Sequence, residues 1–217
     1  MKAKSFTLFS MMLAVSTFQA TLENVQAAGA AKRAPSALPP CCREAVTNAD
    51  AALSGKSIYQ LTSSWTNDAG KTIQLRELRG RPQVVAMIFT SCQGACPLLV
   101  QQMRQLSDAL PPSARTNAGF LLVTFDPKRD TPEVLHAYRA TRNLPENQWT
   151  LLQGSEDDVR ELALVLGVKY RQDANGRFIH SNLITILDAE GEIAFQKAGL
   201  EDATQELAAK LNRLVKP

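Results

Sequence analysis

The strongest constraint on the fold is a pair of uninterrupted apolar runs, at residues 84–89 and 120–125, each followed by a helical pattern. Continuous branched and aromatic residues are typical of strands that are covered on both faces of a sheet. After the first run, apolar side chains recur at helical spacing as far as Pro111, where a helix must stop. After the second, Thr131 is a suitable N-cap and Pro132 a suitable first helical residue. Strands that alternate with helices pair in parallel, so we expect a parallel core.

Shorter patterns on either side of these runs complete the predicted fold. Upstream, alternating residues, a turn and a second short run predict a β-hairpin from 58–65 and 72–75. Downstream we predict a short strand, a helix, a closing hairpin and a last helix, at 149–152, 155–166, 182–187 with 192–195, and 203–214. A βαβ half followed by a ββα half is the layout of a thioredoxin-like α/β fold. We therefore expect a central mixed sheet flanked by helices, with an extra N-terminal β-hairpin.

Residues 1–27 have the layout of a signal peptide. Lys2 and Lys4 precede an uncharged, largely apolar stretch over 5–18, and small residues occupy the −3 and −1 positions of a cleavage site at Ala27. The stretch is shorter than the roughly 20 residues that a membrane span requires. We therefore expect export to the periplasm, and a membrane anchor only if the signal is not cleaved.

The remaining chain divides into a predicted tether and a predicted domain. Residues 28–56 are Ala- and Pro-rich without apolar periodicity, which is typical of a flexible tether, and residues 57–217 carry the folded pattern. The formal net charge is only +3, and basic residues are interspersed with acidic ones. Because no basic stripe is present to contact phosphates, we expect no nucleic-acid partner.

The chemistry of the chain centres on Cys92 and Cys96, directly after the first apolar run. If a helix begins near Cys92, a spacing of four places both sulfurs on one face of its first turn, within reach of a disulfide or a shared metal. A helix N-terminus stabilises thiolates, the form that acts as nucleophile and as metal ligand. Three residues separate the cysteines, whereas redox exchange in thioredoxin-like proteins normally uses two. A structural disulfide, a redox-active dithiol and a soft-metal site all remain open.

A third donor must come from one of two histidines. His136 lies within a predicted helix, and we interpret it as a surface or half-buried side chain. His180 lies in the loop that opens the closing hairpin, and in thioredoxin-like proteins this loop packs beside the dithiol. Two thiolates and one imidazole would form a three-coordinate site that suits copper in either oxidation state.

Two acidic residues follow the second apolar run, where doubly wound sheets present functional loops. Asp126 or Asp130 could orient the site or tune its thiols. For Asp130 we favour the alternative that, together with Thr131, it merely starts the next helix.

Three segments in this order resemble the Sco/SenC family of cytochrome c oxidase assembly proteins. They are Phe-Thr-x-Cys-x-x-x-Cys-Pro at 89–97, Asp-Pro-x-Arg-Asp-Thr at 126–131, and the dipeptide His180-Ser181. The resemblance runs from about Tyr59 to Leu214.

The resemblance implies a thioredoxin-like fold that holds one copper ion per chain, as Cu(I) or Cu(II), through Cys92, Cys96 and His180. It also implies delivery of copper to the binuclear copper centre of cytochrome c oxidase, or reduction of the cysteines of that centre. The implied partner is the copper-receiving subunit of the oxidase or another copper enzyme, with other periplasmic copper chaperones or thiol reductants beside it.

Two departures accompany the resemblance. Residues 93–95 are Gln-Gly-Ala where the family often has Pro or Asp, and the family's N-terminal membrane helix is replaced by a predicted cleavable signal. The adjacent Cys41 and Cys42 have no equivalent in the family motif. A disulfide between adjacent cysteines closes only a strained ring. Cys41 and Cys42 could therefore act as soft metal ligands, transfer copper to Cys92 and Cys96 or reduce their disulfide, or form disulfides with other chains.

The leading hypothesis is a copper chaperone, in which turnover chemistry is not required. The alternative is a thiol-disulfide oxidoreductase that acts through the Cys92 and Cys96 dithiol without obligatory copper. Whether the chain is an enzyme therefore remains open. A peroxiredoxin-like peroxidase is disfavoured, because the helix start lacks the Thr-x-x-Cys arrangement.

Overall fold

The computed structural model describes residues 53–174 and 176–215. The predicted signal peptide and most of the predicted tether, including Cys41 and Cys42, lie outside the described residues. Within those two ranges, no helix combines the length and the apolar character needed to cross a membrane.

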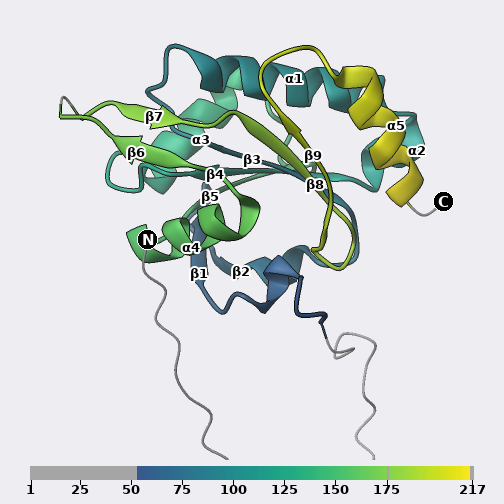
Figure 1. The fold of residues 1–217 in the computed structure, drawn as a ribbon, viewed down its shortest axis with the longest axis horizontal. Helices are drawn as coiled ribbons and strands as arrows, with labels where there is room; N and C mark the ends of the chain where they lie inside the picture. Colours follow the sequence, from purple (N-terminus) through teal and green to yellow (C-terminus); the bar gives the residue numbers. More distant parts are fainter. Residues whose placement is uncertain (1–52, 175, 216–217) are drawn as a thin grey trace, which may run out of the picture. The chain divides into compact units, whose positions relative to one another are not determined.

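The core of the fold is a seven-stranded mixed sheet (Figure 1). The two apolar runs are confirmed as its central strands, which are parallel neighbours and buried at every residue. Parallel and antiparallel partners flank this pair, and the predicted N-terminal hairpin extends one edge. In sheet order the strands are β2 (Thr72–Gln74), β1 (Ser64–Asn67), β5 (Trp149–Gln153), β4 (Gly119–Thr124), β3 (Gln83–Ile88), β8 (Leu183–Leu187) and β9 (Ile193–Ala198).

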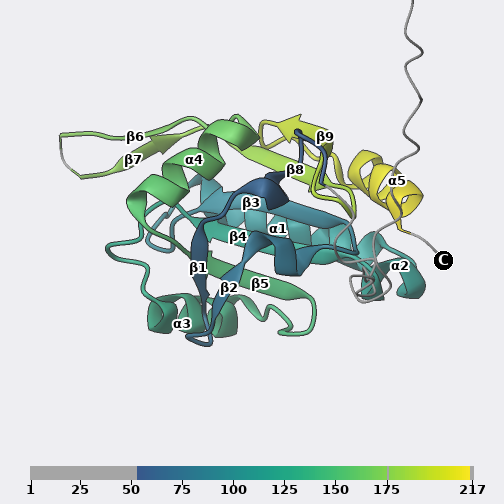
Figure 2. The same ribbon diagram turned by 90° about the horizontal axis from the view of Figure 1, so that it is seen from below.

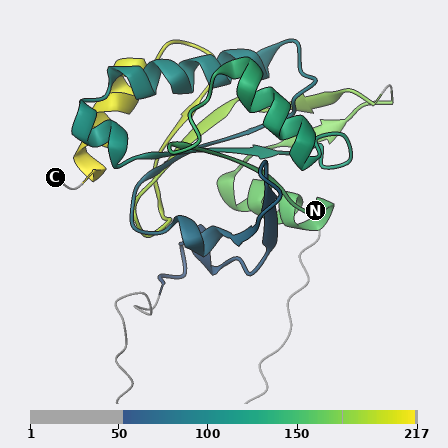
Figure 3. The same cartoon turned by 180° about the vertical axis from the view of Figure 1, so that it is seen from behind.

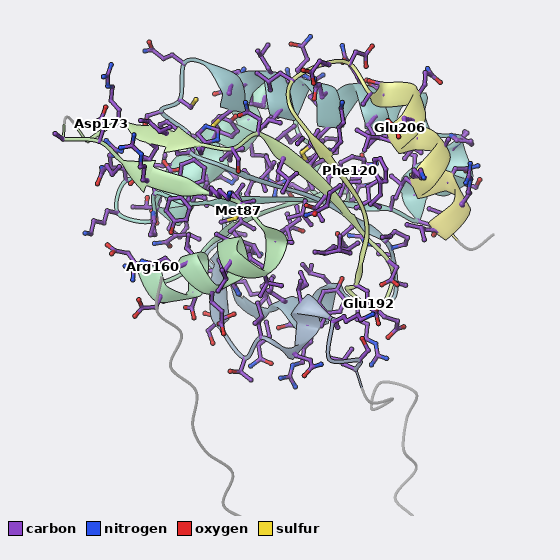
Figure 4. The ribbon with its side chains drawn as sticks, in the orientation of Figure 1. Met87, Phe120, Arg160, Asp173, Glu192 and Glu206 are labelled. Atoms are coloured by element: carbon purple, nitrogen blue, oxygen red, sulfur yellow. The ribbon has the colours of Figure 1, made fainter. Side chains whose placement is uncertain are left out.

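Helices cover both faces of the sheet. Figures 1 and 3 show α1 and α3 on one face and α4 on the other, and α5 packs against α1. Figure 4 shows Met87 and Phe120 inside these layers, whereas Arg160 and Glu206 lie on the outside. The helices are α1 (Ala95–Ala109), α2 (Pro112–Thr116), α3 (Pro132–Arg142), α4 (Glu156–Leu166) and α5 (Thr204–Leu214).

The predicted helix starts at Thr131 and Ser155 are confirmed by their caps. The Thr131 hydroxyl accepts a hydrogen bond from the backbone N–H of Val134, at the start of α3. Ser155 and Asp158 form a reciprocal capping box at the start of α4. Each cap satisfies backbone donors that a helix end leaves without a partner.

The predicted strand over 58–65 is wrong in its first half. Residues Ile58–Gln60 form a 3₁₀ helix, and β1 begins only at Ser64. The Ser57 hydroxyl accepts a hydrogen bond from the Tyr59 N–H, and the consecutive side chains of Ile58 and Tyr59 are both buried. In a strand, consecutive side chains point to opposite faces, whereas here two consecutive side chains are both buried. The Ser57 cap and this burial favour the 3₁₀ helix.

The structure differs from the prediction in two further places near the dithiol. Helix α1 begins at Ala95 and not near Cys92, so only Cys96 lies on the helix. The segment expected as a loop around His180 contains two short strands, β6 (Tyr170–Gln172) and β7 (Phe178–His180), which pair with each other and not with the main sheet. Figure 2 shows this β6–β7 ribbon projecting beyond the sheet. Strands of three residues are too short for apolar periodicity to reveal.

Candidate metal centre

Cys92, Cys96 and His180 come together although they lie on three separate elements. Cys92 lies in the loop between β3 and α1, Cys96 is the second residue of α1, and His180 is the last residue of β7. Their candidate ligand atoms all lie within 4.8 Å of one another, and Cys96 Sγ is 3.5 Å from His180 Nε2. Among the residues that the structure describes, no other group of histidine, cysteine or carboxylate side chains meets this geometry.

The two thiols have different environments. Cys92 is half-buried, whereas Cys96 is fully buried in the core. The N-cap of α1 is Gly94, which offers no side chain, and the Cys96 N–H donates instead to Cys92 Sγ at 3.5 Å. Burial raises the pKa of the Cys96 thiol, and the neighbouring Cys92 side chain raises it further. The Cys92 sulfur is therefore partly accessible to solvent, whereas the Cys96 sulfur is not.

This difference predicts selective modification of the reduced protein. We expect iodoacetamide to modify Cys92 at least about tenfold faster than Cys96, because alkylation needs both access and thiolate. Since the pKa of Cys96 is raised, the difference should persist at a pH of about 9. Peptide mapping by mass spectrometry after short reaction times gives both rates. Equal rates at the two cysteines would contradict the burial of Cys96.

The His180 ring is oriented by its own backbone. Its Nδ1 lies 3.1 Å from the carbonyl oxygen of Ser181. Because a carbonyl oxygen only accepts, this contact requires a proton on Nδ1, and in the neutral ring the lone pair then lies on Nε2, which faces Cys96 Sγ. A backbone partner on the distal nitrogen is the usual way in which proteins present a neutral imidazole to a metal.

Aromatic side chains enclose the inner side of the site. The rings of Phe125 and Phe89 lie 5.0 and 6.0 Å from the His180 ring, centroid to centroid. The outer side opens into a hollow of about 570 Å³ whose lining includes Cys92, Gln93 and His180. A metal at this site would be shielded from within and accessible from the Cys92 side.

Asp130 holds the dithiol loop in place. Its carboxylate is 1% exposed and accepts hydrogen bonds from the Thr90 N–H at 2.9 Å and from the hydroxyls of Thr90 and Thr124. Thr90 lies two residues before Cys92, and the N-cap of α3 is Thr131. Of the two alternatives for Asp130, the contacts favour orientation of the site. Thr90 lies within the motif at 89–97, but the sequence gives it no role, because its partner Asp130 is 40 residues away along the chain.

The other two candidate residues lie elsewhere. His136 is on α3 with a side chain 60% exposed, and its Nδ1 is 3.8 Å from an oxygen of Asp68, as expected of a surface histidine. Asp126 is buried and forms an ion pair with Arg129, which in turn contacts the β6–β7 ribbon.

Comparison with known proteins identifies the family. The SCO1/SenC family model matches residues 52–216. The chain belongs to the SCO1/SenC family. A SCO1 protein homolog of Bacillus subtilis (strain 168) is 25% identical over 142 residues, which cover 64% of this chain and 73% of the relative.

Solved structures of Sco proteins share the fold. ScoI of Bradyrhizobium japonicum, solved with copper bound, has a TM-score of 0.61 at 21% identity, over 70% of this chain and 96% of that one. BsSco has a TM-score of 0.62 at 22% identity, over 70% of this chain and 90% of that one. It is described as a member of the Sco family of cytochrome c oxidase assembly proteins and as containing a disulfide switch. The predicted thioredoxin-like fold and the SCO1/SenC resemblance are confirmed.

Proposed function

We propose that this protein binds one copper ion through Cys92, Cys96 and His180 and passes it to a partner during the assembly of cytochrome c oxidase. The observation that carries the proposal is the convergence of two sulfurs and one imidazole nitrogen within 4.8 Å. Thiolates favour Cu(I), and imidazole suits Cu(I) and Cu(II) alike. A copper-bound Sco structure and a Sco protein described as an oxidase assembly factor support the choice of metal and of process.

The accessible side of the site suggests how copper would leave it. Cys92 and His180 line the open hollow, whereas Cys96 is fully buried and does not line it. A three-coordinate ion has room for an incoming ligand, so a thiolate of the partner can bind before Cys92 dissociates. The partner would be the copper-receiving subunit of the oxidase or another copper enzyme.

We place this activity in the periplasm. The support is the signal-peptide layout of residues 1–27, which implies export to an oxidising compartment. In such a compartment the dithiol must be reduced before it can accept copper, and a periplasmic thiol reductant would supply the electrons.

Metal analysis of the reduced full-length chain tests the ligand set. After incubation with Cu(I) and removal of loose metal, we expect one copper per chain, and none at this site in Cys92→Ser or Cys96→Ser. Each variant is measured with and without replacement of Cys41 and Cys42, so that copper bound by that pair is counted separately. Ser91→Ala, an exposed neighbour of Cys92, is the matched control. Equal copper in the control and in Cys96→Ser would contradict the assignment.

A thiol-disulfide oxidoreductase remains the second candidate, because one accessible and one buried sulfur suit stepwise exchange. The Cys92 thiolate would attack a partner disulfide, form a mixed disulfide and release the first partner thiolate. Cys96 would then attack the Cys92 sulfur, release the second thiolate and leave a Cys92–Cys96 disulfide. The partner gains the two electrons that the dithiol loses.

A further inference from the structure

The β6–β7 ribbon needs an anchor, because it carries His180 and stands apart from the main sheet. Its two strands share three residue pairs, with Tyr170 opposite His180 and Gln172 opposite Phe178. A two-stranded ribbon of this length is at best marginally stable alone in water. The position of the imidazole therefore depends on what holds the ribbon from outside.

Arg129 makes three contacts that join the ribbon to the rest of the domain. Its Nε donates to the buried carboxylate of Asp126, just after β4. Its Nη2 donates to the carbonyl oxygen of Gly176 at 3.3 Å, in the segment between the two strands. Its guanidinium carbon lies 5.7 Å from the centroid of the Phe178 ring. One planar, multivalent cation thus links the β4 end to the turn and to β7.

The contact with Phe178 transmits this support to His180. Residues two apart on a strand point to the same face, so the side chains of Phe178 and His180 lie together and Ile179 points away, 50% exposed. The Phe178 ring packs against Phe89 and Phe125, at centroid distances of 5.3 and 5.1 Å, and these two rings also flank the imidazole. A displacement of Phe178 must therefore displace His180.

The dithiol loop has a separate support. Asp130 binds Thr90 and Thr124, and no hydrogen bond or ion pair that we find in the described ranges connects its carboxylate to the ribbon. Neighbouring residues of one loop thus act on different halves of the site. Arg129 reaches the imidazole side, and Asp130 reaches the thiol side.

We propose that Arg129 is a positioning residue of the metal centre, which keeps His180 facing the thiols while Asp130 independently keeps the dithiol loop in place. Without Arg129 the ribbon should open locally, and the imidazole should leave the site while both sulfurs stay. The structural part of this inference stands without copper, and its consequence for metal binding rests on the proposed function.

The first test needs no metal. Amide hydrogen exchange and the NMR shifts of the His180 ring protons are compared between wild type and Arg129→Gln. We expect exchange in the ribbon to accelerate about tenfold, the effect of losing a few weak contacts, with loss of the ring-current shifts caused by Phe89 and Phe125. Exchange in β3 and β4 should not change. The inference would be overturned if the His180 ring shifts and the amide exchange of the ribbon in Arg129→Gln equal those of wild type. It would also be overturned if exchange accelerates equally in the ribbon and throughout the main sheet.

Two matched variants separate geometry from charge. Lys128→Gln removes a cation from the same loop, but that side chain is 81% exposed and pairs with Glu156, so it should behave like wild type. Arg129→Lys keeps the charge but cannot reach Asp126 and Gly176 together, so it should behave like Arg129→Gln. If amide exchange in the ribbon of Arg129→Lys equals that of wild type, the role assigned to the planar guanidinium is contradicted.

The second test reads out the metal site. The EPR spectrum of the Cu(II)-loaded Arg129→Gln protein should lose nitrogen coordination, as in His180→Ala, while coordination by the sulfurs of Cys92 and Cys96 stays. If the wild-type protein binds no copper, the proposed function fails and hydrogen exchange still decides the inference. If wild type and Arg129→Gln give identical nitrogen coordination, the proposed function stands and the inference is overturned.

Discussion

His180→Ala is expected to lower the affinity of the reduced protein for Cu(II) by about a hundredfold or more. When the binding free energy of a structural metal site is divided among its ligands, each ligand accounts for several kcal/mol. The loss should be smaller for Cu(I), because the thiolates of Cys92 and Cys96 already suit that ion. Reduction of a small disulfide should proceed at the wild-type rate, because the imidazole is not needed for thiol exchange. Competition titrations with a chelator and a disulfide-reduction assay measure the two properties.

The control for this prediction is the only other histidine. His136→Ala removes an exposed imidazole on α3 and should leave both copper affinity and disulfide reduction unchanged. Equal Cu(II) affinity in both histidine variants would contradict the ligand role of His180. Loss of disulfide reduction together with copper binding would instead indicate that the substitution disturbs the dithiol itself.

Asp68→Ala is expected to destabilise the domain by about 3–5 kcal/mol, the usual effect of removing one partner of a buried ion pair. The Arg139 guanidinium is 7% exposed and donates to both oxygens of Asp68, and also to the carbonyls of Leu144 and Trp149. Because Asp68 lies in the turn between β1 and β2, the pair joins the N-terminal hairpin to α3 and β5. Urea unfolding of wild type and variant, at equal m-values, gives the difference in free energy.

An exposed ion pair provides the comparison. Asp157→Ala breaks the contact between Asp157 and Arg160, whose side chains are 90% and 60% exposed, and should change stability by less than about 1 kcal/mol. A double variant, Asp68→Leu with Arg139→Met, should recover most of the lost stability, because it removes the unpaired buried charge. A loss in Asp68→Ala no larger than in Asp157→Ala would show that the buried pair contributes little.

Most of the fold could be predicted where a signal lies within a few residues. Strands β3 and β4 were predictable because burial on both faces requires uninterrupted apolar residues. The starts of α3 and α4 were predictable because Thr131 and Ser155 cap them directly. The start of α1 was misplaced because no side chain caps it, and the sulfur of Cys92 accepts the N–H of Cys96 instead.

The ligand residues of the candidate site could be predicted, and Asp130 could be named as a possible support, but the roles of Thr90 and Arg129 could not. Cysteine and histidine are few in this chain and chemically distinctive, so the motifs around Cys92, Cys96 and His180 identify them. Thr90 and Arg129 are common residue types, and their roles depend on partners that only folding brings close, Asp130 for the first and Gly176 with Phe178 for the second.

The central strands, the capped helices and the chemical identity of the candidate ligands follow from local properties of the chain, namely apolar period, capping and side-chain chemistry. By contrast, the 3.5 Å between Cys96 Sγ and His180 Nε2, in residues 84 positions apart, arises from the folding of the whole domain. Contacts between remote segments set that distance. The sheet order places β8 beside β3, and Arg129 with the rings of Phe89 and Phe125 holds the short β6–β7 ribbon against the site.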